Sequence, residues 1–175
     1  MVLKKKFFDV ELEVLDIKVP IFSRDEESIV GQVIKYDLTK FLRGKNCEAR
    51  FKVIKSDDKI LGHIYFFMIQ PAFIRKMIGR NISIIEDSFV VKCSDSVLRI
   101  KPFLITRRKV SRNIRNSLRK ETKEFMLKRF LDQTRTQAFQ DIFSSLLQKS
   151  LSKHLKKIYP LAVCEIRMAK VESKN

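Results

Sequence analysis

The stretch FQDIFSSLLQKSLSKHLKKIYPLAVCEIRMAKV, residues 139–171, changes its hydrophobic period partway along. From Phe139 to Ile158 the apolar residues recur every three or four positions, which is the spacing of an amphipathic helix. Pro160 disfavours helix at the residue before it. Residues 161–171 then alternate apolar and polar side chains, which predicts a strand that returns to a sheet. A helical region followed by a final strand indicates an α+β fold.

The first hundred residues predict the rest of this sheet. Pro71 can begin one short helix and Gly79 can end it. The second half of residues 107–135 also has helical spacing, and Pro102 suggests an edge or irregular position within its strand. Alternating segments predict strands over residues 12–19, 29–38, 47–55, 60–69, 82–93 and 97–106.

We expect these elements to form one domain over residues 1–175, because no repeat or long linker divides the chain. Residues 7–106 are expected to be mainly strands, 107–159 helical and basic, and 161–171 the returning strand. The predicted sheet is mostly antiparallel, has about six or seven strands and curls like a barrel, with the C-terminal helices packed on it.

Composition favours a folded intracellular protein. Hydrophobic residues make up 45% of the 175, which is enough to build a core. No apolar run approaches the roughly 20 residues of a membrane span. The first eight residues lack the apolar region of a signal peptide. Three cysteines lie far apart (Cys47, Cys93 and Cys164), and this pattern is typical of reduced thiols in a cytosolic protein.

The charge points to a polyanionic partner. The chain carries 37 Lys and Arg against 20 Asp and Glu, a net charge of +17. Such an excess disfavours a compact fold unless a partner neutralises it, and nucleic acid and an anionic membrane surface are the two candidates. Residues 99–130 contain 12 basic and 2 acidic residues, so more than half of the net charge lies in this segment. We expect such a block to be an interaction surface.

The centre of this block is rich in arginine, whose planar guanidinium grips phosphate oxygens and stacks on unpaired bases. On a helix, residues 108, 112, 115 and 119 share one face, and the opposite side can bury Leu118 and Phe125. This pattern favours RNA binding, while a merely solvated amphipathic helix and a membrane-surface helix stay open as alternatives. The candidate contacts are Arg107, Arg108, Lys109, Arg112, Arg115, Arg119 and Lys120.

The sequence does not predict an enzyme. The histidines, His63 and His154, have no cysteine or carboxylate at ligand spacing, so we expect no metal site. The chain lacks a CxxC pair, a glycine-rich phosphate loop and a GxSxG nucleophile turn, so we expect no cofactor, small-molecule substrate or catalytic residue. Zinc-finger spacing and other motifs that read DNA grooves are also missing.

Several short motifs resemble those of the S-three-A-e (e-S-one) family of archaeal and eukaryotic small-subunit ribosomal proteins. Residues 98–102 read LRIKP, residues 106–109 read TRRK, and LRK follows at 118–120. Residues 156–161 read KKIYPL and lead into a strand that contains EIR at 165–167. The resemblance extends over about residues 7–171. The long basic extensions of eukaryotic members are missing, so the chain is similar to the compact archaeal type.

The resemblance implies a non-catalytic structural protein of the small ribosomal subunit in the cytoplasm. It implies binding to rRNA on the platform, near the mRNA exit and the rRNA 3′ end, with platform proteins and mRNA as neighbours and no membrane contact. It adds Arg99 and Lys101 to the basic segment, and Lys156 and Lys157 as a second patch. A free-standing RNA-binding regulator or chaperone that acts off the ribosome is the alternative.

Overall fold

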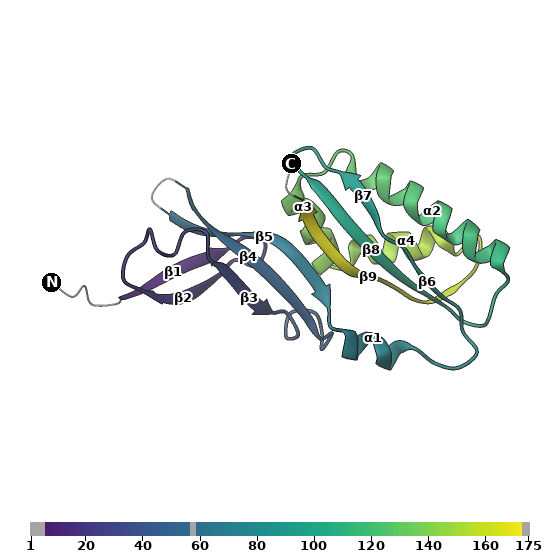
Figure 1. Cartoon of the computed structure of the whole chain (residues 1–175). Helices are drawn as coiled ribbons and strands as arrows, with labels where there is room; N and C mark the ends of the chain where they lie inside the picture. Colours follow the sequence, from purple (N-terminus) through teal and green to yellow (C-terminus); the bar gives the residue numbers. More distant parts are fainter. Residues whose placement is uncertain (1–5, 57–58, 173–175) are drawn as a thin grey trace.

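The computed structural model describes residues 6–56 and 59–172 and has an α+β architecture, as predicted. Figure 1 shows one long, bent sheet with the three later helices at one end. The strands are β1 (Lys6–Leu12), β2 (Ile17–Ser23), β3 (Val33–Asp37), β4 (Cys47–Ser56), β5 (Lys59–Ile69), β6 (Ile84–Glu86), β7 (Phe89–Lys92), β8 (Val97–Thr106) and β9 (Leu161–Glu172). The helices are α1 (Pro71–Met77), α2 (Arg112–Phe130), α3 (Arg135–Phe143) and α4 (Leu146–Leu155).

The strands run in the order β2-β1-β5-β9-β8-β6, with β4 also on β5, β3 on β4 and β7 on β8. Every pairing is antiparallel except the short parallel one between β1 and β5. Strand β5 pairs with β1 at Leu61 and Gly62, and with β9 at Phe66 to Met68. It therefore joins the N-terminal strands to the C-terminal ones.

The predicted mostly antiparallel sheet with the C-terminal helices packed on it is confirmed, but the prediction of a barrel-like form with six or seven strands needs two corrections. The described residues form nine strands, and the sheet is mixed and does not close. The predicted strand over residues 12–19 is instead a hairpin of β1 and β2, whose turn places Val14 and Asp16 at positive φ. Asp16 is a common turn residue, but Val14 is β-branched and favours extended backbone, and the apolar alternation continues through it, which explains the missed break. The predicted strand over 82–93 divides into β6 and β7.

Other local predictions match the structure more closely. Strand β8 has the predicted bounds, and its register shifts between Lys101 and Pro102, where the proline was expected to disturb it. In contrast, the expected end of a strand at Pro20 is wrong, because β2 continues through Pro20 to Ser23; it lies at an end of the strand order, where proline is tolerated. The segment 29–38 forms a strand only from Val33, because a turn with Gly31 at φ 86° precedes it. The strands predicted over 47–55 and 60–69 imply a hairpin turn at Asp57 and Asp58, and these two residues lie outside the described part of the chain.

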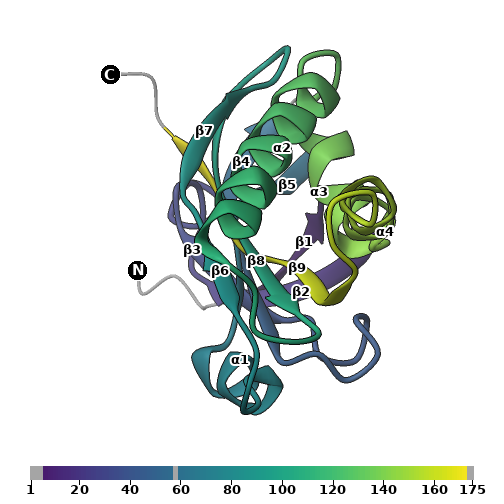
Figure 2. The same cartoon turned by 90° about the vertical axis from the view of Figure 1, so that its right-hand side faces the viewer.

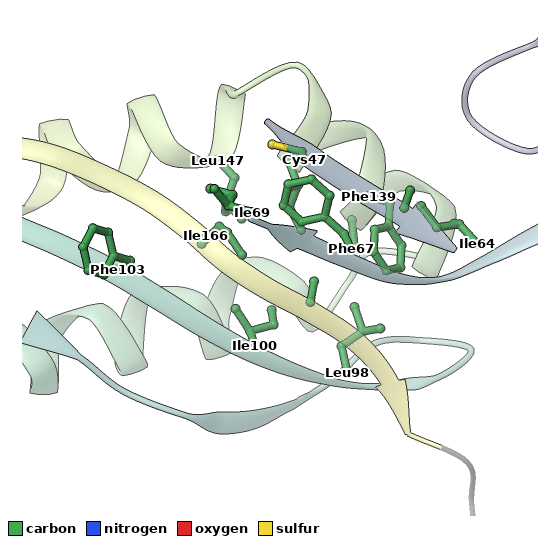
Figure 3. Packing of buried hydrophobic residues seen from close by; sticks show 14 of the residues in the cluster. Cys47, Ile64, Phe67, Ile69, Leu98, Ile100, Phe103, Phe139, Leu147 and Ile166 are labelled. Atoms are coloured by element: carbon green, nitrogen blue, oxygen red, sulfur yellow. The ribbon is translucent and has the colours of Figure 1, made fainter. Parts of the chain in front are cut away.

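The helical stripe of residues 139–158 divides into two helices. Ser145 adopts a left-handed φ of 59° between α3 and α4, which redirects the chain. Both helices bury their apolar faces, and α2 and α4 lie on the same side of β8 and β9 (Figure 2). Figure 3 shows side chains from β5, β8, β9, α3 and α4 gathered in one cluster, with Phe67, Phe103 and Phe139 among its largest members.

A polar junction ties the N-terminal hairpin to α3. Glu13, in the β1–β2 turn, accepts hydrogen bonds from Thr136 Oγ1 at 2.8 Å and from Arg135 Nη2 at 3.1 Å. It also accepts the backbone N–H of Ile64 at 3.3 Å, where β5 passes from β1 to β9. Arg135 Nη2 lies 2.6 Å from His63 Nδ1 as well. Glu13 and Arg135 are only about a fifth exposed, so solvent screens their attraction weakly.

We predict that Glu13→Ala lowers the free energy of unfolding by about 2–3 kcal/mol, because it leaves the guanidinium of Arg135 half-buried without its carboxylate. Urea unfolding followed by circular dichroism measures the change. The matched control is Glu26→Ala, which breaks the exposed pair with Lys55 and should cost less than about 0.5 kcal/mol. Equal losses in the two variants would contradict this role for Glu13.

Candidate nucleic-acid interface

The loop that carries the first three candidate cations is held by two buried hydroxyl groups. Strand β8 ends at Thr106, whose Oγ1 donates to the carbonyl of Arg108 at 2.7 Å and accepts the N–H of Ser83 at 3.0 Å. Ser83 Oγ in turn accepts the N–H of Val110 at 3.1 Å. Both hydroxyls are buried, so they fix the backbone of residues 107–110 while its side chains extend outward. Arg107, Arg108 and Lys109 are all exposed.

Helix α2 then presents cations along its first three turns. Arg112, Arg119 and Lys123 lie on one exposed face at seven- and eleven-residue spacing, with Lys120 nearby. The opposite face buries Leu118 and Met126. The first turn contains no acidic residue, and the Ser111 side chain makes no capping hydrogen bond within the described structure. The helix therefore begins with open N–H groups next to basic side chains, an arrangement that suits an anion.

Two residues of the predicted basic helix face of 108, 112, 115 and 119 do not lie on the exposed face of α2. Arg108 precedes α2 and belongs to the loop. Arg115 is half-buried on the side of Leu118, and its Nε is buried without a hydrogen-bond partner among the described residues. The predicted face of 108, 112, 115 and 119 is therefore wrong, and the exposed face consists of 112, 119 and 123. Arg108 lies outside the helix because a loop of residues 107–111 follows β8, and Arg115 lies at the border of the buried face of α2.

The second predicted patch meets the first in space. Lys156 and Lys157 follow the last turn of α4, and Leu161, which begins β9, pairs with Thr106 at the end of β8. This pairing brings the α4–β9 turn beside the loop of residues 107–111, at the right-hand edge of Figure 1. We call this exposed set the basic end: Arg107, Arg108, Lys109, Arg112, Arg119, Lys120, Lys123, Lys156 and Lys157.

Arg99 and Lys101 lie apart from the basic end. They alternate along β8 with the buried Leu98 and Ile100, so they lie on the sheet face opposite the core. Lys101 is six residues before Arg107 on an extended strand, about 20 Å away at the usual rise. Arg99 is also paired with Glu172 of β9. In contrast, no member of the basic end forms an ion pair within residues 6–56 and 59–172.

A groove of about 800 Å³ adjoins the basic end. Helix α4 and the start of β9 line one side, and the turn of residues 38–46 between β3 and β4 lines the other. Figure 2 shows this turn and α4 on the same side of the molecule. Six basic residues line the groove against one acidic residue, Glu165. They are Arg43, Lys45, Arg107, Lys149, Lys153 and Lys156.

Sequence reasoning missed four of these six. Lys149, Lys153 and Lys156 recur at four and three residues on the polar side of the apolar stripe that predicted α4, so that spacing could have identified them. Arg43 and Lys45 are not part of any periodic pattern in the sequence that could have identified them. They come from a turn between two strands, and only the pairing of β4 with β5 and of β5 with β9 places that turn near α4.

The cysteines do not form a reactive centre. Cys164 lines the groove, but burial raises the pKa of its thiol to about 12. Burial likewise raises the pKa of Cys47 to about 12 and that of Cys93 to about 11. All three stay protonated at neutral pH and are poor nucleophiles. The part of the chain that the structure describes contains no group of three or more His, Cys, Asp or Glu placed to hold a metal ion.

Among the described helices, none is both long and apolar enough to cross a lipid bilayer. The long helix α2 is amphipathic and carries its cations on the exposed side. The basic end and the groove concentrate positive charge on a fixed backbone, and apart from Lys45 none of these cations is paired with an acidic side chain of the described residues. This arrangement suits the phosphates of a nucleic acid.

We predict that Thr106→Val loosens the basic loop without changing its charge. The substitution keeps the shape of the side chain but leaves the N–H of Ser83 and the carbonyl of Arg108 without this partner. It should lower the free energy of unfolding by about 1–3 kcal/mol and speed amide exchange over residues 108–111. Hydrogen exchange read by mass spectrometry tests this, with Thr39→Val, in an exposed turn, as the control. Unchanged exchange in Thr106→Val would contradict it.

Comparison with known proteins agrees with the resemblance carried by the LRIKP, TRRK, LRK and KKIYPL segments. A model of the Ribosomal S3Ae family matches residues 4–175. The chain is 26% identical over 138 residues to small ribosomal subunit protein eS1 of Saccharolobus islandicus (strain L.S.2.15). The aligned region covers 78% of this chain and 66% of the relative, so this chain spans a little under two thirds of the length of that protein. It is 25% identical to the eS1 protein of Nanoarchaeum equitans, covering 100% of this chain and 96% of the relative. The eS1 protein of Methanothrix thermoacetophila is 26% identical over 85% of this chain and 73% of its own length. With a family model matched over nearly its whole length, the chain belongs to the Ribosomal S3Ae family.

Proposed function

We propose that this protein is a structural constituent of the small ribosomal subunit and that its basic end binds rRNA. One observation carries the proposal: nine exposed cations gather on a fixed loop, a helix face and a helix end, and none of them is neutralised within the described residues. Binding of such a surface to RNA is favourable because its cations neutralise phosphates and release the counterions condensed on the RNA. Family membership supports the ribosome as the place where that RNA is found.

The geometry favours recognition of shape and backbone over reading of sequence. Five of the nine cations are lysines and four are arginines, and they lie along a convex helix face and two adjoining turns. A convex face of this kind can follow the phosphates of a folded RNA, where structured RNA is recognised mainly by its shape and backbone. Because the backbone of residues 107–110 is already fixed, RNA binding costs less conformational entropy than it would with a flexible loop.

The finer placement is also a proposal and rests on the family resemblance. We place the protein on the platform of the small subunit, near the mRNA exit and the rRNA 3′ end, in the cytoplasm. Its neighbours there are platform ribosomal proteins and mRNA. We propose no catalytic role, and the buried thiols and the scattered histidines support that view. Arg99 and Lys101, on the opposite sheet face, are proposed as a separate contact, with Arg99 held by Glu172.

The test is incorporation into small subunits. We predict that Arg112→Glu with Arg119→Glu removes the chain from the small-subunit fraction of a sucrose gradient, because the reversal changes four units of charge on the exposed face of α2. Both side chains are exposed, so the fold should be kept, as shown by an unchanged helical signal. The matched control is Lys18→Glu with Lys35→Glu on β2 and β3, which reverses the same charge far from the basic end.

Wild-type protein and the control variant should sediment with the small subunit. Wild-type protein that stays at the top of the gradient while it binds RNA would favour the free-standing RNA-binding module. Equal loss in both double variants would show that net charge alone, and not the basic end, governs incorporation.

A further inference from the structure

We propose that the groove beside α4 holds a single-stranded RNA segment, with one unpaired base stacked on Phe41. This rests on the proposed function, and it assigns to the groove a ligand different from the folded RNA of the basic end. Cations and an exposed aromatic ring occur together there: Phe41 and five basic residues without ion pairs in the described chain line the same hollow. Sites for single strands combine a cationic groove with a ring on which bases stack.

Phe41 is presented in a fixed position. It is 49% exposed, whereas its neighbours Leu38 and Leu42 are buried and anchor the turn of residues 38–46. The turn is closed by backbone hydrogen bonds from Leu42 N–H to Leu38 O and from Gly44 N–H to Thr39 O, both 2.9 Å. The ring of Tyr36 lies beside Phe41, with centroids 6.1 Å apart. An aromatic ring held in this way loses little entropy when a base stacks on it.

An ion pair fixes the distance between the two walls. Lys45, from the same turn, donates to Glu165 of β9 at 2.6 Å, and both side chains are largely buried. In this contact Glu165, the single acidic residue among those lining the groove, neutralises the charge of Lys45. The other five cations are left to face the hollow without compensation among the described residues. The groove is therefore held open and is electrically positive.

The cations of α4 follow the length of the groove. Lys149, Lys153 and Lys156 lie on one helix face, and seven residues of helix span about 10 Å. Arg107 joins the groove to the basic end, because it belongs to both. A strand that leaves a folded RNA bound on α2 can therefore enter the groove without crossing a neutral surface.

An unpaired strand fits these features better than a duplex. A double helix turns its bases inward and offers only its backbone to Phe41, whereas an unpaired base exposes a face that can stack. An acidic peptide would satisfy the cations, but its side chains give the aromatic ring no planar partner. These two ligands serve as the opposing outcomes of the test.

The chain contains no tryptophan, so Phe41→Trp creates a single fluorescent reporter in the groove. We expect a 12-nucleotide oligouridine to quench its emission at least twofold at saturation. A 12-base-pair RNA duplex and a 12-residue polyglutamate should leave the emission unchanged. The matched control is Phe7→Trp on β1, an exposed position remote from the groove, where oligouridine should cause no quenching.

Two further variants separate stacking from charge. Phe41→Leu keeps an apolar side chain but cannot stack, and it should weaken oligouridine binding, measured by fluorescence anisotropy, by about tenfold. Lys149→Ala with Lys153→Ala should lower the slope of log affinity against log salt by about 1.4, because two phosphate contacts are lost. Phe41→Leu also keeps the test valid if Phe41→Trp fails to fold.

Unquenched Phe41→Trp together with unchanged affinity of Phe41→Leu would overturn the proposal. Equal quenching by the duplex would overturn the choice of a single strand, and quenching or displacement by polyglutamate would favour a peptide. The results distinguish failure of this proposal from failure of the proposed ribosomal function. A chain that sediments with small subunits but shows no effect at Phe41 disproves only the groove, whereas quenching in a chain absent from subunits disproves only the ribosomal role.

Discussion

The insertion of β9 between β5 and β8 is the contact on which the rest of the structure depends. β9 pairs with β8 from Val97 to Thr106, and with β5 over three residues. Without it, the N-terminal strands and the C-terminal strands would share no hydrogen-bonded partner in the strand order. The same pairing sets Leu161 opposite Thr106, and this register brings Lys156 and Lys157 beside the loop of residues 107–111. The final strand thus completes both the sheet and the basic end.

The basic end carries an electrostatic cost that the core offsets. Nine exposed cations repel one another without an acidic partner in the described chain, and such repulsion destabilises a compact state. The helices that carry them are anchored by fully buried residues, Leu118 and Met126 in α2 and Leu151 and Leu155 in α4. The buried hydroxyls of Thr106 and Ser83 hold the loop of residues 107–110, which connects β8 to α2. The RNA that we propose as the partner would therefore meet charges that are already fixed in place, and a preorganised surface loses less entropy on binding.

Local sequence patterns predicted the elements with strong periodicity and missed those decided by distant contacts. The α+β class, strands β4, β5, β8 and β9 and helix α1 could be read from alternation, helical spacing and proline positions. The loop of residues 107–111 could not, because it lies in a segment that was expected to be helical. The β1–β2 turn could not, because Val14 and Asp16 hold positive φ without a glycine or proline. The sheet is open, and β5 and β8 each change partners along their length, which no local pattern records. The groove was missed for the same reason, since Phe41 and Lys149 meet only through the pairing of β4, β5 and β9.

Whether RNA contacts this protein at its basic end, as we propose, can be tested in the assembled subunit. The most direct measurement is ultraviolet crosslinking of native small subunits, followed by mass spectrometry of the peptides that carry a nucleotide. We expect crosslinks within residues 107–123 and 149–157, the segments that hold the exposed cations of α2, of the loop before it, of α4 and of the turn after α4. Crosslinks confined to the strands β1 to β3, with none in those two segments, would contradict it.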